Sequence, residues 1–359
     1  MTPAPIAQKP ITIHDVAGAL GMHKSTVSLA FSGKGNLSAA TRERVLTAAR
    51  ELGYEPNPLA QRLAHGGSNN VVYIFSGVLD VGLATEKILI IQRELNRQAL
   101  EVPIYTCGET GGHDMVAQAA QIKQLCRQRP RAIVCSTQML SPSVFRELET
   151  YQRGGGIVIS YDSPAPLECD QVVFDREDNG YQAARHLLER GHRRIGLSYP
   201  TRGNPDARIA ASNGRLRGFR RALDEFGVAL HAEWIFTNPT YEKGGAAMAR
   251  QFLDLLERPT GLCIVNDYVA LGFMVEVMRA GLRIPEEVSI VGHDDQPIAS
   301  YCPVPLTSIS QPVEDIARAV VELLLERLEG SAALPRTVTL KGQLMPRESV
   351  AARSSENGG

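Results

Sequence analysis

Two successive series of short apolar runs, beginning at Val71, constrain the fold more than any other feature. The first series is VVYIF (71–75), VPIYTC (102–107), RAIVCS (131–136) and GIVISYD (156–162). The second is QVVFD (171–175), RIGLSYP (194–200), GLCIVND (261–267) and VSIVGHDD (288–295). Amphipathic segments at 86–100, 180–190, 215–226 and 268–280 lie between them. Val/Ile-rich strands that alternate with helices are typical of parallel sheets covered on both faces, so we predict two similar α/β lobes.

The first 56 residues have a different pattern, typical of a small helical unit. Thr12 followed by Asp15 indicates a capping box, and apolar residues then recur at helical spacing as far as Leu20. Gly21 ends this helix, and a second helix is expected over Lys24–Phe31. Ser38 can cap a third helix, for which Gly53 is the expected end. The third helix is expected to bury Val45, Ala48, Ala49 and Leu52. Three short helices with a tight glycine turn indicate a helix-turn-helix domain.

These patterns divide the chain into five parts. Residues 1–10 are expected to be a disordered arm, 11–56 the helical domain, 57–70 a short helix with a flexible linker, and 351–359 a flexible tail. The core, 71–350, is divided into one lobe of about 71–165 and 303–333 and a second of about 166–302 and 334–350. Three such crossings would let the lobes hinge about a cleft.

Composition limits the possible functions without identifying one. Of 359 residues, 43% are hydrophobic and 21% charged, as expected for a chain with a sizeable core. The net charge of −1 conceals a positive N-terminal part, because residues 1–65 hold seven Lys/Arg and four Asp/Glu. The six scattered cysteines indicate a reduced, cytoplasmic setting. No signal peptide or membrane-spanning run is visible, so we expect no membrane partner.

Ordered motifs along nearly the whole chain resemble one family. The motifs are Ile13–Ala17, Thr26–Ser28, Ser38–Val45, Leu52–Asn57, Arg215–Ala222, Asn266-Asp267, Ala270–Gly272, Ser289–Asp295, Pro305–Ile309 and Arg347–Ser349. Together they resemble the lactose-repressor/galactose-repressor family of bacterial transcription regulators. The resemblance implies a helix-turn-helix head on a core of two parallel-sheet lobes like those of periplasmic binding proteins.

The second helix of such a head lies in the major groove of DNA, where its N-terminal residues meet base edges. Lys24 and Ser25 are therefore expected to face the bases, while Thr26 and Ser28 suit phosphate oxygens. Two positions depart from the family pattern. His23 replaces a common serine at the helix start and is expected to cap poorly but to contact a phosphate. Leu29 replaces a common arginine, so a guanine contact is lost or replaced by contact with a thymine methyl.

Asn57–His65 resembles the family's hinge helix, which forms on the operator and enters the minor groove. Leu63 matches the leucine that wedges into the central base step, and Ala60 is small enough to let the backbone approach the groove floor. Asn57 begins this segment and is included among the DNA contacts. The alternative is that Leu59 and Leu63 form an i, i+4 core pair in a linker helix.

The expected effector site lies beyond the carboxyl ends of the strands, where ligands bind in open α/β sheets. By resemblance, Asp162, Arg217 and Asp267 correspond to polar contacts with a sugar-like ligand or a purine edge. Tyr241 matches a stacking aromatic, and Ser76 and Ser136 are weaker candidates. Structural roles stay open, with Arg217 bridging the lobes or Asp267 capping a helix. His293-Asp294-Asp295 is interpreted as a structural turn.

The sequence thus predicts a DNA-binding regulator, most simply a repressor, that acts as a homodimer. Its expected partners are a pseudo-palindromic double-stranded DNA operator and a small-molecule effector. No cofactor, metal site or catalytic constellation is expected, and the short tail without leucine heptads favours a dimer over a tetramer. Two alternatives stay open: a solute-binding protein of transport, which would share the two lobes, and an α/β enzyme that uses the cleft.

Overall fold

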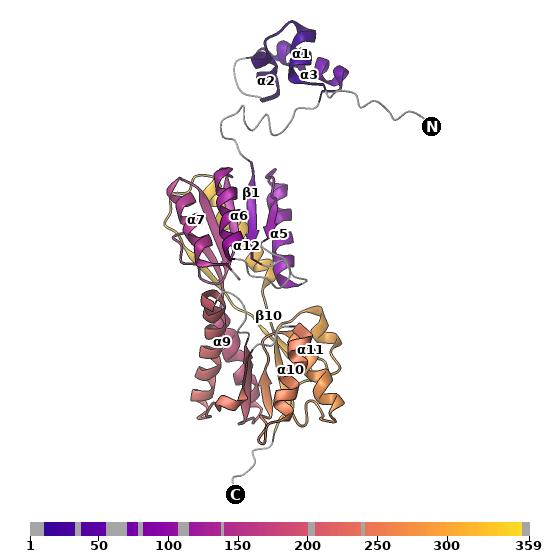
Figure 1. Cartoon of the computed structure of the whole chain (residues 1–359), viewed down its shortest axis with the longest axis vertical. Coiled ribbons are helices and arrows are strands. Elements are labelled where there is room, and N and C mark those ends of the chain that lie inside the picture. Colours follow the sequence, from indigo (N-terminus) through magenta and orange to yellow (C-terminus); the bar gives the residue numbers. More distant parts are fainter. Residues whose placement is uncertain are drawn as a thin grey trace, which may run out of the picture. The chain divides into compact units, whose positions relative to one another are not determined.

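A computed structural model describes residues 11–32, 37–54, 70–77, 82–106, 115–137, 140–199, 205–237 and 241–353. By its contacts the chain divides into a head, Met1–Asn69, and a core, Asn70–Gly359 (Figure 1). Among the described residues, no helix has the length and apolar character needed to cross a membrane.

The described part of the head contains three helices around one small core. The helices are α1 (Ile13–Leu20), α2 (Lys24–Ser32) and α3 (Ala39–Leu52). Their core comprises Val16, Ala17, Val27, Ala30, Val45 and Ala49. Phe31 and Tyr54 pack edge to face beside it, with ring centroids 5.6 Å apart. Leu52 does not join this core, contrary to expectation: it is the last residue of α3, and 38% of its surface is exposed.

The helix ends follow from the residues that the sequence places there. Asp15 accepts a hydrogen bond from the Thr12 backbone N–H at 2.7 Å and completes the predicted capping box. The Ser38 hydroxyl accepts from the Thr41 N–H at 3.1 Å. Gly21 and Gly53 have φ of 63° and 69°, the left-handed conformation that a side chain would strain.

Lobe 1 of the core is a six-stranded parallel sheet in the order β11-β5-β4-β3-β1-β2. Its strands are β1 (Val72–Ser76), β2 (Ile104–Thr106), β3 (Ala132–Ser136), β4 (Ile157–Asp162), β5 (Asp170–Phe174) and β11 (Thr337–Leu340). Its helices are α5 (Leu83–Arg97), α6 (Met115–Arg127), α7 (Pro142–Arg153) and α12 (Val313–Leu328). Two separate apolar cores form, one with α5 and α12 and one with α6 and α7, so helices cover both faces.

Lobe 2 repeats this plan with the sheet order β12-β10-β9-β8-β6-β7, in which only β12 is antiparallel. Its strands are β6 (Ile195–Tyr199), β7 (Ile235–Thr237), β8 (Gly261–Cys263), β9 (Ser289–Asp294), β10 (Thr307–Ser310) and β12 (Leu344–Met345). Its helices are α8 (Arg176–Glu189), α9 (Pro205–Glu225), α10 (Tyr241–Leu253) and α11 (Asp267–Arg279), with short turns η1 (Ala232–Trp234) and η2 (Pro297–Tyr301). The pairs α8–α9 and α10–α11 each pack on one face.

The chain passes between the lobes after β5, β10 and β11. The predicted crossings near 165, 303 and 333 each come too early. Asp170–Phe174 pairs with β4 and stays in lobe 1, where Arg327 contacts Asp170 at 2.5 Å. Thr307–Ser310 pairs with β9 in lobe 2. The apolar pattern of a strand does not state which sheet it joins, so the crossings depend on tertiary pairing. The predicted arm (1–10) and most of the linker and tail lie outside the described residues.

Glycines allow the helix pairs of lobe 2 to approach at backbone distance. A Cβ at Gly218 of α9 would lie 1.8 Å from the Glu177 carbonyl oxygen, and one at Gly180 of α8 would lie 2.1 Å from that of Arg215. Helices α10 and α11 repeat the arrangement through Gly245 and Gly272, at 2.1 and 2.0 Å. This close approach places Arg215 against α8, beside the point where the lobes meet.

Candidate DNA-reading helix and inter-lobe effector site

Helix α2 divides its residues between the core of the head and solvent. Val27 and Ala30 are buried, whereas Lys24 and Ser25 at its N-terminal end are exposed. Thr26 and Ser28 are half-buried, and Leu29 is 40% exposed. The exposed positions are those that a groove-reading helix would use, and they include both the cation and the unusual leucine.

His23 takes the place of a capping serine in an unexpected way. Its Nδ1 lies 2.8 Å from Ser25 Oγ and accepts from the Ser25 N–H at 3.4 Å, while its carbonyl accepts from Thr26 N–H at 2.9 Å. The ring nitrogen reaches the donor that a serine oxygen would meet, but the 3.4 Å bond is long and weak, which agrees with the expectation that histidine caps poorly. Nε2 points away from that bond and stays the atom for a proposed phosphate contact.

Asn57, Ala60 and Leu63 lie outside the described residues and stay predictions. The segments that follow β1, β2, β3, β6 and β7 also lie outside the described residues. They are 78–81, 107–114, 138–139, 200–204 and 238–240. The described part of the candidate effector site is therefore a set of polar residues at the strand ends and on α5, α8 and α9. We call it the inter-lobe group; its members are Lys87, Ser136, Asp162, Arg176, Arg215, Asp294 and Gln311.

Asp162 is the centre of this group in lobe 1. It is fully buried at the end of β4, forms an ion pair with Lys87 of α5, and accepts from Ser136 Oγ at 2.9 Å. Burial alone would raise the pKa of Asp162, but Lys87 and Arg176 reverse this effect and lower it. The structure thus brings predicted Ser136 and Asp162 together, and it adds Lys87, which no sequence motif indicated.

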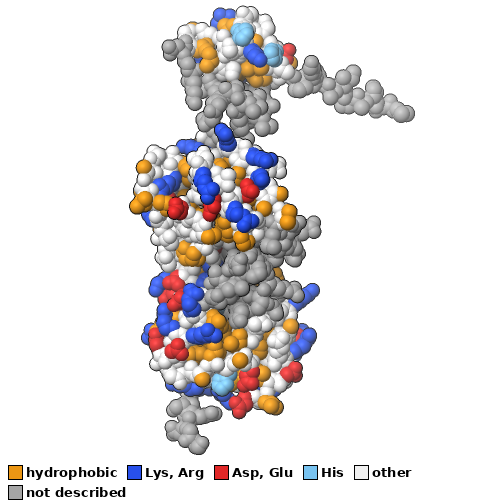
Figure 2. Space-filling model, turned by 60° about the vertical axis from the view of Figure 1, so that its left-hand side comes forward, with side chains coloured by type: hydrophobic (Ala, Val, Ile, Leu, Met, Phe, Trp, Pro, Cys, Tyr) orange, Lys and Arg blue, Asp and Glu red, His pale blue; other side chains and the backbone are white. Residues whose placement is uncertain are grey.

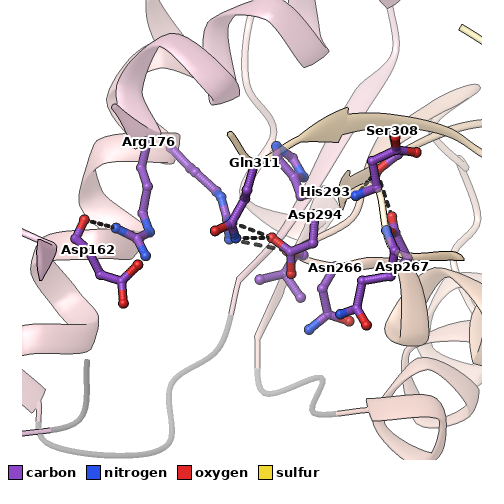
Figure 3. Close-up of polar contacts among 12 residues, drawn as sticks. Asp162, Arg176, Asn266, Asp267, His293, Asp294, Ser308 and Gln311 are labelled. Carbon is purple, nitrogen blue, oxygen red and sulfur yellow. Dashed lines mark hydrogen bonds and ion pairs between the residues drawn. The ribbon is translucent and has the colours of Figure 1, made fainter. Parts of the chain in front are cut away.

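Residues of lobe 2 approach Asp162 from α8 and from the end of β10. Arg176 donates to the Asp162 carbonyl oxygen at 2.8 Å and to Ser163 Oγ at 3.0 Å. Gln311 lies 3.4 Å from Lys87 Nζ through its Oε1 and donates from Nε2 to Asp294 at 2.6 Å. Figure 3 shows Asp294 and Gln311 between the Asp162–Arg176 contact and the Asp267–Ser308 contact.

Asp294 ends β9 as Asp162 ends β4, and both have the same unusual backbone. Their φ values are 96° and 85°, and Asp295 follows with 47°. Non-glycine residues in this region are uncommon, and such conformations cluster at functional sites. The interpretation of His293-Asp294-Asp295 as only a turn is incomplete. His293 is indeed structural, since its Nδ1 lies 2.8 Å from the Ile264 carbonyl oxygen, but Asp294 joins the inter-lobe group.

Arg215, not Arg217, is the arginine of α9 that reaches this group. Arg215 Nη2 lies 3.8 Å from Asp294 Oδ1, and Nη1 donates to the Val265 carbonyl oxygen at 3.1 Å. Arg217 is 61% exposed and pairs with Glu177 at 2.8 Å. Helical spacing explains the difference, because Arg215 precedes buried Phe219 by four residues and shares its face. That spacing was visible in the sequence.

The remaining predicted residues are placed less directly. Asp267 is buried at the start of α11, where its carboxylate accepts from Ser308 Oγ at 2.6 Å and from the Gln296 N–H at 2.7 Å. Burial and nearby Asp294 raise the pKa of Asp267 to about 8, against the effect of those two donors. Asn266, not Asp267, caps the helix. Ser76 is buried at the end of β1, and Tyr241 begins α10 with 46% of its surface exposed.

Comparisons with known proteins agree with this architecture. Residues 12–57 match the model of "Bacterial regulatory proteins, lacI family", and residues 184–350 match "Periplasmic binding protein-like domain". Together the two matches span more than half of the chain, in the expected order. The chain belongs to the lacI family.

Relatives of this regulator match nearly its full length. It is 28% identical over 340 residues to the HTH-type transcriptional repressor PurR of Vibrio vulnificus, covering 94% of this chain and 98% of that protein. The PurR of Aliivibrio salmonicida is 27% identical over 339 residues, with the same coverage. A lac repressor dimer bound to operator and the anti-inducer ONPF matches with a TM-score of 0.80 at 25% identity, covering 96% and 100%. A CelR–cellobiose complex matches with a TM-score of 0.69 at 25% identity, covering 94% and 99%.

Buried histidines make the stability of this regulator sensitive to acid. Burial lowers the pKa of His192 from 6.5 to about 4 and that of His293 to about 3. Below pH 6.5 the unfolded chain therefore binds protons that the native chain does not, so stability falls as the pH falls toward 4. We expect the thermal midpoint to drop over this range, and to drop less in His192→Gln.

The test compares the acid sensitivity of His192→Gln with that of wild type. The comparison is needed because Asp267, whose pKa is raised, makes the folded chain more stable as the pH falls, opposite to the effect of the histidines. His192 Nδ1 lies 3.0 Å from Thr260 Oγ1 and Nε2 lies 3.1 Å from the Ala351 carbonyl oxygen, bonds that a glutamine can replace without titrating. His14→Gln, at an exposed position of α1, is the control. Equal acid sensitivity of wild type and His192→Gln would contradict the prediction.

Proposed function

We propose that this regulator is a repressor that binds a pseudo-palindromic double-stranded DNA operator as a homodimer. In this proposal its operator affinity is set by a small effector held where the two lobes meet. The observation that carries the DNA part is helix α2, whose buried face holds it in the head while Lys24, Ser25 and Leu29 face solvent. The lac repressor structure, a dimer bound to operator, supports the assembly.

The residues of α2 receive separate roles in this proposal. Lys24 and Ser25 meet base edges, because they lie at the N-terminal end of the helix. Thr26 and Ser28 hold phosphate oxygens, and His23 does so through Nε2. Leu29 contacts a thymine methyl where an arginine would bind guanine, which changes the operator sequence that this regulator reads. Asn57, Ala60 and Leu63 form the hinge contacts in the minor groove.

The effector part rests on the inter-lobe group. Asp162 and Ser136 come from lobe 1, while Arg176, Arg215 and Asp294 come from lobe 2, so a ligand that contacts both sets would favour one lobe arrangement over another. A ligand shifts such an equilibrium only by its difference in affinity for the two states. Ser76, Tyr241 and Asp267 stay candidate contacts. The regulator acts here by binding and not by catalysis, and it acts in the cytoplasm, where its operator is.

Salt-dependent operator binding tests the DNA part. We expect the full chain to bind DNA from upstream of its own gene with an affinity that falls steeply with salt. Lys24→Ala should weaken this binding by roughly 10–100-fold, the range of a base contact, and relax the specificity at the base that Lys24 contacts. Arg50→Ala removes the same charge from the exposed end of α3 and should cost far less. Absence of specific binding at low salt, with or without effectors, would contradict the proposal.

A further inference from the structure

Among the described residues, the charged side chains where the lobes meet do not balance one another. Lys87 and Asp162 neutralise each other as a buried pair, with exposures of 1% and 0%. Arg215 and Asp294 form a second, looser pair at 3.8 Å. Arg176 is the fifth charge, and it contributes an excess positive charge to the group. Figure 2 shows side chains of both signs on the visible face of each lobe.

Arg176 is buried, and none of its hydrogen bonds to described residues reaches a carboxylate. Only 8% of its surface is exposed, and its hydrogen bonds go to two neutral acceptors, the Asp162 carbonyl oxygen and Ser163 Oγ. Among the described residues, none of the ion pairs within 4.0 Å involves Arg176. Burial lowers the pKa of Arg176, although the negative charges of Asp162 and Asp294 act to raise it. A buried charge without a partner is costly unless a ligand supplies the partner.

Arg215 also has unused donor capacity. Its Nε is buried and has no hydrogen-bond partner among the described residues. Burial lowers the pKa of Arg215 to about 10, and Arg176 adds to this shift, so the two cations lie close enough to repel. Asp294 opposes the shift but already accepts from Gln311. Asp267 adds little negative charge at neutral pH, since its pKa of about 8 leaves it mostly protonated.

We propose that the inter-lobe site takes an anionic effector, a small metabolite that bears a carboxylate or phosphate, which Arg176 and Arg215 bind. The inference rests on the proposed effector site and specifies the chemical class of its ligand. Guanidinium groups match both anions with paired hydrogen bonds, which is why arginine serves such recognition. A neutral sugar would leave the excess positive charge of the group unpaired.

The test compares acids with their neutral counterparts on the full chain. Thermal midpoints are measured at constant pH and ionic strength while sodium chloride is exchanged for sodium gluconate, sodium phosphate or ribose 5-phosphate. Glucose and ribose are the neutral probes. We expect an acid to raise the midpoint where its neutral counterpart does not. Arg176→Gln should weaken the apparent affinity for that acid by at least about tenfold. Arg185→Gln, at an exposed position of the same helix, should not.

Operator binding by each variant, measured alongside, separates the failure of this inference from failure of the proposed function. Arg176→Lys keeps the positive charge but loses the paired donors of the guanidinium, so we expect an intermediate loss of affinity. This variant replaces Arg176→Gln in the test if the glutamine variant folds poorly. A neutral probe that stabilises wild type as well as its acid would overturn the inference. So would an anion response that is equal in wild type, Arg176→Gln and Arg176→Lys, or absent from all three.

Discussion

Replacing Lys87 with methionine is expected to lower the free energy of unfolding by about 3–5 kcal/mol, the range for breaking a buried ion pair from one side. Methionine is close to lysine in length and fills the same space, so little of the loss comes from packing. The cost arises because Asp162 would remain fully buried with Ser136 as its side-chain donor and without its ion-pair partner, so that the more distant charge of Arg176 is the remaining one that stabilises it among the described residues. Urea denaturation of the full chain, followed by circular dichroism, measures it.

The double variant Lys87→Met/Asp162→Asn is the matched control. An asparagine at 162 can still accept from Ser136 and carries no charge, so most of the lost stability should return. If the single variant loses less than about 1 kcal/mol, as an exposed pair would, the buried pair does not hold lobe 1 as described. If the double variant is no better than the single one, the loss came from shape and not from charge.

Gly218→Ala is expected to destabilise the chain by about 3 kcal/mol, at the upper end of the range for overpacking. The new Cβ would lie 1.8 Å from the Glu177 carbonyl oxygen and 2.8 Å from the Tyr181 nitrogen. Both atoms belong to the backbone of α8, so no side chain can rotate away and the helices must separate. Because Arg215 lies on α9 against Gly180, the separation should also weaken the effector response of operator binding.

Gly18→Ala is the matched control for Gly218→Ala and is expected to have the opposite effect on stability. A Cβ at Gly18, inside α1, has nothing within 4 Å. Alanine there should stabilise the head by about 0.5–1 kcal/mol through helix propensity alone. Thermal unfolding compares the two variants directly. A Gly218→Ala chain as stable as wild type would show that α8 and α9 are not in backbone contact.

The sequence by itself determined the local structure of the head. Thr12, Gly21, Ser38 and Gly53 act through bonds and dihedral angles within a few residues, so their pattern predicts the helix ends without knowledge of the fold. The two lobes were predictable for a related reason. Parallel strands buried on both faces need continuous apolar runs, and the alternation of such runs with helices permits few arrangements.

Only the tertiary structure decided which charges meet. Lys87 lies 75 positions before Asp162, and no spacing rule links a helical lysine to the end of a distant strand. The crossings between lobes were misplaced because Asp170–Phe174 and Thr307–Ser310 look alike as strands but pair with different sheets. Arg215 lies between these cases, since its face of α9 follows from helical spacing, whereas its neighbour Asp294 does not. Local bonds are encoded by neighbouring residues, but a buried charge acquires its partner only when distant segments exclude water together.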